Sequence, residues 1–307
     1  MAQRAVPMRK ARLGRAVGAT GDGEAVQGVV LLLPGGRALS TGRPSPLSSA
    51  TTAATARRLA RDGRADGLVA HVVHYRNRGW NGAAAHPVAD AHWAADEVIR
   101  RYGDVSICLA GTGMGARAAL RAGGHPAVNS VLALAPWLPE RPVASEPLAA
   151  EPLSAEPLGA ESLSAESLAT RPLDAGPSGS GPAEWWWATH QADGNRAGAE
   201  EPVAQLADRR VLIVHGTNDQ RTDPELSYRL ALRAKKINRD ICRFEVHTDG
   251  HALAQHRAEV LALSSNFVRG ALFAHPFARP LTDALAAPPP LGLRMPLAAG
   301  FGSARRR

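Results

Sequence analysis

The first half of the chain alternates short apolar runs with longer segments of helical periodicity. The strand-like runs are residues 29–33, 68–75, 105–110 and 128–135, and the helical segments between them are 48–60, 88–102 and 116–122. The run 29–33 is apolar at every position, which is typical of a strand buried on both faces of a sheet. Strands separated by helices of this length form β-α-β units. The sequence therefore predicts an α/β fold with a mostly parallel central sheet flanked by helices.

A tandem repeat interrupts this alternation. From Ser145 the chain reads SEPLA, AEPLS, AEPLG, AESLS, AESLA and TRPLD. Residues 145–174 are rich in proline, glutamate and small side chains that cannot bury a core, so we expect a disordered acidic insert. A lid or an interaction tether is the alternative. The pattern resumes at Val203, with strands at 210–215 and 242–247 and helices at 223–236 and 257–269.

These changes in pattern divide the chain into consecutive parts. We expect a flexible basic arm at 1–26 and a first half of the core at 27–140, followed by a disordered insert with a lid-like segment at 141–202. A second half of the core at 203–272 and a Pro-rich basic tail at 273–307 complete the chain.

Composition and charge argue against several classes of function. The net charge is +8, but part of the excess lies at the two ends and no nucleic-acid-binding motif accompanies it. We therefore expect no nucleic acid as a partner. No apolar run approaches the roughly 18 residues of a membrane span, and the N-terminus lacks the apolar stretch of a secretory signal. We expect a cytoplasmic protein without a membrane span, in which Cys108 and Cys242 are reduced core residues. The oligomeric state stays open.

The turn after the strand 105–110 has the pattern of a nucleophile elbow. It reads Gly111-Thr112-Gly113-Met114-Gly115 and joins a strand to a short Ala-rich helix. In the pattern G-x-S-x-G the flanking glycines let the strand and the helix approach closely, and the serine sits at a strained positive φ. Here both flanking glycines are present, and the centre is Gly113.

Two later loops supply an acid and a base. Asp219 follows the strand 210–215, and His251 follows the next strand. An aspartate in such a loop orients a histidine and stabilises its charged form. The ends of parallel strands meet at one edge of the sheet, where ligand sites of open α/β sheets lie. The chain order of elbow, aspartate and histidine is the order of an α/β-hydrolase triad.

Together these residues resemble the α/β-hydrolase superfamily, which includes serine hydrolases and esterases. The resemblance covers roughly residues 27–140 and 200–272 and rests on the motifs LLLPGG, LAGTGMGA, VLIVHGTNDQRTDP and TDGHAL. It implies that Asp219 is the acid of the triad and that His251 is the base. It also implies an oxyanion hole made by the backbone N–H of Met114 with that of Gly35 or Gly36. Gly113 departs from the family because it stands at the position of the serine.

This departure changes the expected chemistry more than the expected stability. Glycine lacks the hydroxyl of the acyl-enzyme route, and loss of a triad nucleophile costs about 10⁶ in rate. The glycine also relieves backbone strain on the order of 1 kcal/mol, since no side chain is held at a positive φ. The resemblance implies a hydrolase acting on an ester or related acyl bond of a small molecule, with ordinary serine hydrolysis impaired or absent. Three versions stay open: a general-base mechanism through His251, a weak esterase that uses water attack alone, and a non-catalytic protein that binds a small ligand or a partner.

Other residues compete for the chemistry. Thr112 adjoins the elbow, but we expect its side chain to point away from the site. A metal site formed by His215, Asp219 and His251 is the alternative to a family dyad, although we expect neither a metal nor another cofactor. The indoles of Trp80 and Trp137 are candidates either for the wall of a pocket or for ordinary packing.

Overall fold

The structure is a computed structural model that describes residues 9–18, 25–43, 45–138 and 200–303. The repeats at 145–174 and almost all of the predicted insert, including its lid-like segment, lie outside these residues. No helix in the described ranges is both long enough and apolar enough to span a lipid bilayer.

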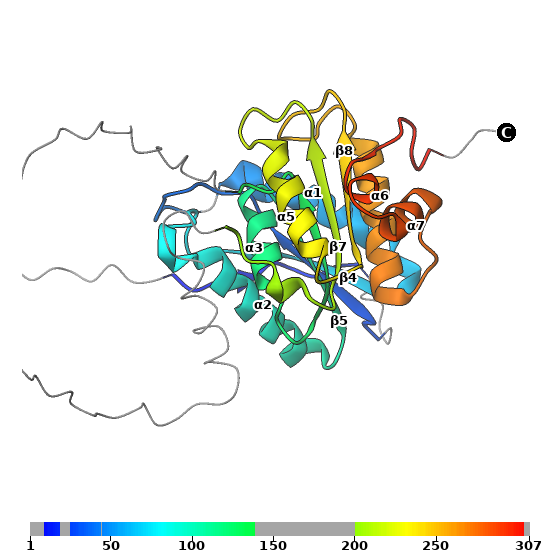
Figure 1. Cartoon of the computed structure of the whole chain (residues 1–307). Coiled ribbons are helices and arrows are strands. Elements are labelled where there is room, and N and C mark those ends of the chain that lie inside the picture. Colours follow the sequence, from blue (N-terminus) through cyan, green and yellow to red (C-terminus); the bar gives the residue numbers. More distant parts are fainter. Residues whose placement is uncertain (1–8, 19–24, 44, 139–199, 304–307) are drawn as a thin grey trace, which may run out of the picture. The chain divides into compact units, whose positions relative to one another are not determined.

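A single path of paired strands runs through the described core (Figure 1). The strands are β1 (Arg12–Leu13), β2 (Val17–Gly18), β3 (Gly28–Leu33), β4 (Leu68–His74), β5 (Ser106–Thr112), β6 (Val128–Leu134), β7 (Arg210–Gly216), β8 (Ile241–Val246) and β9 (Met295–Pro296). Their order is β1-β4-β3-β5-β6-β7-β8-β9, and β2 also pairs with β4. Every neighbouring pair from β4 to β9 is parallel, whereas β1 and β2 are antiparallel to β4. The carboxyl ends of the parallel strands therefore share one edge.

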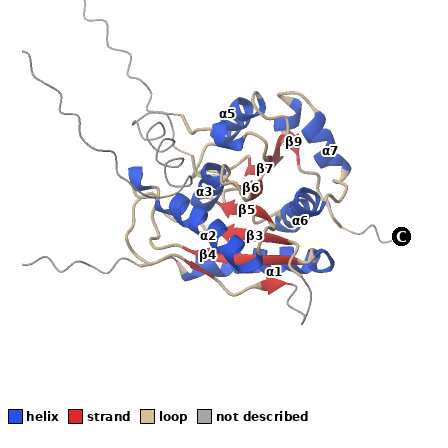
Figure 2. Cartoon of the chain, turned by 90° about the horizontal axis from the view of Figure 1, so that it is seen from below, coloured by secondary structure: helices blue, strands red, loops and turns tan. Residues whose placement is uncertain are grey.

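Helices cover both faces of this sheet (Figure 2). The helices are α1 (Pro46–Asp62), α2 (His86–Tyr102), α3 (Met114–Ala122), α5 (Pro224–Lys235), α6 (Arg257–Phe273) and α7 (Arg279–Ala286), with short 3-10 turns at η1 (Arg64–Asp66), η2 (Gly82–Ala84), η3 (Ala204–Leu206) and η4 (Leu291–Leu293). Alternate side chains of each strand enter two separate cores. One core packs against α2, α3 and α5, and the other packs against α1, α6 and α7. The predicted parallel α/β fold is confirmed.

Local sequence signals explain where α5 begins. Its N-cap is Asp223, whose carboxylate accepts a hydrogen bond from the N–H of Glu225, and Pro224 occupies the first helical turn. Both residues favour a helix start, because an aspartate satisfies a free N–H of the first turn and proline has no N–H to leave unpaired. This helix start positions the side chains of α5 that reach the site described below.

The two ends of the described core contain more structure than the sequence suggests. The N-terminal segment forms β1 and β2, which pair with the outer side of β4. The C-terminal segment forms α7, η4 and β9, and β9 extends the sheet beyond β8. The three strands have two residues each, too few to show an alternating pattern, so their pairing depends on exposed backbone groups of β4 and β8.

Candidate active site

The turn between β5 and α3 has the backbone of a nucleophile elbow. Gly113 lies between these elements with φ 57° and ψ −117°. Its N–H donates to the carbonyl of Leu134, and its own carbonyl accepts from the N–H groups of Arg117 and Trp137, at 3.0, 3.2 and 3.0 Å. These bonds fix the turn through the backbone alone. The sharp conformation is therefore present although residue 113 has no side chain.

The three glycines of the elbow differ in what surrounds them. A Cβ on Gly111 would overlap the backbone of Gly115, and a Cβ on Gly115 would overlap the carbonyl of Leu33. A Cβ on Gly113 would meet no backbone: its nearest neighbour would be Nε2 of His251, at 3.1 Å. Gly111 and Gly115 are thus required by close packing, whereas position 113 faces the imidazole.

The carboxylate of Asp219, in the loop after β7, has four hydrogen-bond partners. Its Oδ1 accepts from the backbone N–H groups of Arg221 and Thr222, at 2.8 and 3.2 Å. Its Oδ2 lies 2.8 Å from Nδ1 of His251 and 3.0 Å from Nε2 of His215. Burial by itself raises the pKa of Asp219, but the bonds from His215, the Arg221 N–H and His251 outweigh it and hold the pKa well below its ordinary value. The group is therefore an anion that can only accept hydrogen bonds.

His251 lies in the loop after β8, which Asp249 organises. The buried carboxylate of Asp249 accepts from the N–H groups of Gly250 and Ala254 at Oδ1 and of His256 at Oδ2. Gly216 allows this loop to approach β7, since a Cβ there would overlap the carbonyl of Asp249. The loop points Nδ1 of His251 at Asp219. Nε2 has no hydrogen-bond partner within the described parts of the chain, and it faces Gly113.

The residues implied for an oxyanion hole lie beside the elbow. Met114 is the first residue of α3, so its N–H has no intrahelical acceptor. Gly36 lies against the side chain of Met114, where a Cβ would overlap the sulfur. The carbonyl of Gly35 accepts a hydrogen bond from the hydroxyl of Ser48, at 3.0 Å. The loop after β3 thus lies close to the first turn of α3.

The competing residues have other surroundings. Thr112 is exposed and has no hydrogen bond to His251 among the described contacts, and burial raises the pKa of the Cys108 thiol to about 12. Trp80 and Trp137 pack around Arg117, whose guanidinium carbon lies 4.0 and 5.1 Å from the two rings. One ring nitrogen of His215 and one of His251 bond directly to Asp219. No group of three or more His, Cys, Asp or Glu side chains in the described ranges is arranged to hold a metal ion.

Sequence reasoning did not assign the supporting roles of His215 and Asp249. Both residues were visible in the motifs, but their hydrogen bonds depend on how the two loops fold back. The spacing of His215 and Asp219 by four residues was the available signal, because a turn after a strand can bring such side chains together.

Known structures share this fold at low sequence identity. No protein-family model and no curated protein matches the sequence. A thermophilic esterase from Thermogutta terrifontis, solved with bound butyrate, is 16% identical with a TM-score of 0.52, and the match covers 89% of this chain and 94% of that one. A serine hydrolase without a lid from Xanthomonas campestris is 16% identical (TM-score 0.51; 88% and 93% covered). A putative α/β hydrolase of unknown function from Agrobacterium tumefaciens is 13% identical (TM-score 0.51; 88% and 94% covered). The chain therefore has the α/β-hydrolase fold.

Proposed function

We propose that this protein hydrolyses an ester or related acyl bond of a small molecule, with His251 as general base and water as nucleophile. The observation that carries the proposal is the position of one imidazole. Nδ1 of His251 is held at 2.8 Å by Asp219, and Nε2 lies 3.1 Å from the place of a Cβ on Gly113. The base is thus aimed at the site where the family's nucleophile would be, and none of the described residues bonds to its basic nitrogen.

Asp219 sets the tautomer of this base. Because the carboxylate only accepts, the proton of neutral His251 lies on Nδ1 and the lone pair lies on Nε2. A water molecule beside Gly113 would donate a hydrogen bond to that lone pair. As the water oxygen bonds to the acyl carbon, its proton passes to Nε2, and the carboxylate stabilises the resulting imidazolium.

The tetrahedral intermediate then collapses. The bond between the acyl carbon and the leaving-group oxygen breaks, and His251 returns the proton to that oxygen, so the products are an acid and an alcohol. The N–H of Met114 and that of Gly35 or Gly36 are the proposed donors to the oxyanion. These groups belong to the backbone and do not depend on the side chain at position 113.

A non-catalytic protein that binds a small molecule is the second candidate. The favouring observation is the missing hydroxyl at Gly113, where a glycine keeps the elbow but removes the covalent step. Such a protein would use the same surroundings to hold a ligand without turning it over.

Ester hydrolysis by four purified chains separates these functions. The chains are the parent, His251→Ala, Gly113→Ser and, as a matched control, His247→Ala, which changes an exposed histidine just after β8. p-Nitrophenyl butyrate is a suitable probe because the Thermogutta esterase holds butyrate. We expect slow turnover by the parent, loss of at least about a hundredfold in His251→Ala, as for a general base, and no loss in His247→Ala.

The serine variant and a covalent probe complete the test. A fluorophosphonate should label Gly113→Ser and leave the parent unlabelled, because the parent has no side chain at the centre of the elbow. Turnover that survives His251→Ala would exclude the general-base mechanism. An inert parent with an active Gly113→Ser variant would support the binding protein.

A further inference from the structure

A second histidine holds the same carboxylate oxygen as His251. His215, the sixth residue of β7, is fully buried, and its Nε2 lies 3.0 Å from Oδ2 of Asp219. His215 contacts the carboxylate from the interior, while His251 contacts it from the partly exposed side of the site. The catalytic mechanism proposed above does not use His215.

His215 is itself held by a chain of buried groups. Its Nδ1 lies 2.8 Å from the hydroxyl oxygen of Ser227 on α5. That oxygen accepts a hydrogen bond from Nε of Arg243 on β8, at 2.9 Å, and lies 2.8 Å from the carbonyl of Pro224. Three elements, β7, α5 and β8, thus contribute one contiguous set of hydrogen bonds that ends at Asp219.

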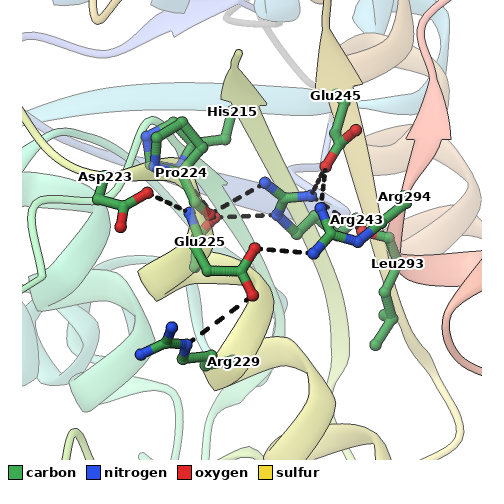
Figure 3. Close-up of polar contacts among 10 residues, drawn as sticks. His215, Asp223, Pro224, Glu225, Arg229, Arg243, Glu245, Leu293 and Arg294 are labelled. Atoms are coloured by element: carbon green, nitrogen blue, oxygen red, sulfur yellow. Dashed lines mark hydrogen bonds and ion pairs between the residues drawn. The ribbon is translucent and has the colours of Figure 1, made fainter. Parts of the chain in front are cut away.

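The guanidinium of Arg243 cannot turn away from Ser227 without losing several bonds. One terminal nitrogen donates to Glu245 at 2.7 Å and to the carbonyl of Leu293 at 3.0 Å, and the other donates to the carbonyl of Pro224 at 3.1 Å. Figure 3 shows this guanidinium between Glu245 and the first turn of α5. Since Arg243 is fully buried, each lost bond would leave a polar group without water to replace it.

The donors and acceptors along this chain fix the protons. Asp219 accepts only, so Nε2 of His215 carries a proton. Arg243 donates only, so the oxygen of Ser227 accepts from it and directs its own hydrogen to Nδ1 of His215 or to Pro224. Burial lowers the pKa of His215, and the charge of Arg243 lowers it further against the opposing effect of Asp219. His215 is therefore neutral, with its proton on Nε2 and its lone pair on Nδ1.

We propose that His215, locked by Ser227 and Arg243, is a positioning residue that fixes Asp219 toward His251. A neutral donor orients the carboxylate without cancelling its charge, whereas a cation at this place would compete with the imidazolium of His251. Oδ1 is fixed by backbone N–H groups and Oδ2 by His215, so the carboxylate stays in place while His251 gains and loses its proton. The proposal rests on the proposed function in one respect, which is that Asp219 and His251 form the acid–base pair.

Nitrogen-15 NMR of the imidazole rings in the full chain tests this role without any substrate. We expect neutral His251 with its proton on Nδ1 and neutral His215 with its proton on Nε2. In His215→Leu the Nδ1–H population of His251 should fall, and the exchange of that proton with water should accelerate. His215→Gln should restore the parent behaviour, because its side-chain amide can donate to Asp219.

Two further variants keep the test decisive. Ser227→Ala removes the hydroxyl that joins His215 to Arg243 and is the milder change if His215→Leu does not fold. His71→Leu is the matched control. His71 lies on strand β4, is equally buried, and bonds to the Gly14 carbonyl and to Tyr102. The control should lose stability without moving the His251 signals.

The outcomes separate this inference from the proposed function. Unchanged His251 signals in folded His215→Leu or Ser227→Ala would overturn the positioning role, as would a proton on Nδ1 of His215 in the parent. A parent without ester turnover but with the expected tautomers would refute the proposed hydrolysis and leave the positioning role standing.

Discussion

The two halves of the candidate site are built in opposite ways. The elbow is built from backbone: three glycines, a helix start, a hydrogen bond from the N–H of Gly113 to β6 and one from α3 to the carbonyl of Gly113. The acid–base half is a set of side chains in which Asp219 alone receives four hydrogen bonds. A backbone frame keeps its shape when its central side chain is absent. A buried polar set does not, because each deletion leaves a partner unpaired. This contrast explains how residue 113 can be glycine in an otherwise ordered site.

The largest effect is expected where the elbow has no room. Gly115→Ala places a methyl group on the carbonyl of Leu33, which is backbone and cannot move without shifting β3. We expect the free energy of unfolding to fall by about 3 kcal/mol or more, measured in urea. Gly35→Ala is the control, since its nearest contact would be an ordinary 3.5 Å. Equal stability of the two variants would show that the elbow is not held by this close approach.

The acid–base half should fail next, at Asp219→Asn. The backbone N–H groups at Oδ1 can only donate, so the amide NH₂ of the asparagine must lie at the position of Oδ2, beside His251 and His215. There it can donate only to a histidine that gives up the tautomer it has in the parent. We expect a loss of about 1–3 kcal/mol in the free energy of unfolding, because the charge and the acceptor at Oδ2 are both lost. Asp223→Asn is the control, as asparagine caps a helix equally well and should cost almost nothing. If Asp219→Asn leaves the free energy of unfolding unchanged, the hydrogen bonds around residue 219 are not tightly held.

Low pH should destabilise the acid–base half of the site and leave the elbow unaffected. The pKa of Asp219 is lowered in the folded chain, so its stabilisation is present above its ordinary value of 3.8 and is lost as the pH falls below it. We expect the unfolding free energy of the parent to drop more steeply below pH 4 than that of Asp219→Asn. Gly113→Ser should keep the steep slope of the parent, since it adds no group that titrates there. Parallel curves for parent and Asp219→Asn would contradict the low pKa.

The sequence predicted the strands and the elbow of this site better than the hydrogen bonds that support its acid–base pair. The apolar runs at 29–33 and 210–215 located β3 and β7, because strands buried on both faces have unbroken hydrophobic patterns. The spacing of the elbow glycines and the order of the loops indicated which residues would meet. The pairing of Asp219 with His251 followed from that order, but the hydrogen bonds of His215 and Asp249 that support the pair could not be predicted. They depend on tertiary contacts between loops that sequence places far apart.

Arg243 illustrates that limit. A charged residue in the middle of an apolar strand was visible, but sequence alone usually assigns such a residue to a solvent-facing position. Its burial depends on carbonyl groups of Pro224 and Leu293, supplied by α5 and by the C-terminal segment. That segment was expected to be a Pro-rich tail. Its η4 turn and β9 strand are too short to produce a periodic pattern, so the partner of Arg243 could not be foreseen.

Position 113 should show a smaller effect than its glycine neighbours. In Gly113→Ala the new methyl group meets only Nε2 of His251, at 3.1 Å, and the residue keeps φ near 57°. We expect a loss of about 1–2 kcal/mol, mostly from the positive φ. Gly82→Ala isolates the backbone contribution, because Gly82 has φ 60° and open space around it. A much larger loss of unfolding free energy in Gly113→Ala than in Gly82→Ala would show that the side chain of His251 cannot move aside. It would then weaken the expectation that Gly113→Ser restores a working nucleophile.

The smallest effect is expected at the outer end of the acid–base half, in Arg294→Ala. Arg294 pairs with Glu225 and Glu245 and lies 3.8 Å over the ring of Tyr228, but its side chain is 43% exposed. Exposed pairs are weak, so we expect a loss below about 1 kcal/mol in the free energy of unfolding. Arg243 keeps its bonds to Glu245 and to two carbonyls, and the His251 tautomer should therefore stay unchanged in NMR spectra. A shift of that tautomer would extend the positioning network to the surface, and the sharp division between an exposed rim and a buried, rigid support for Asp219 would have to be abandoned.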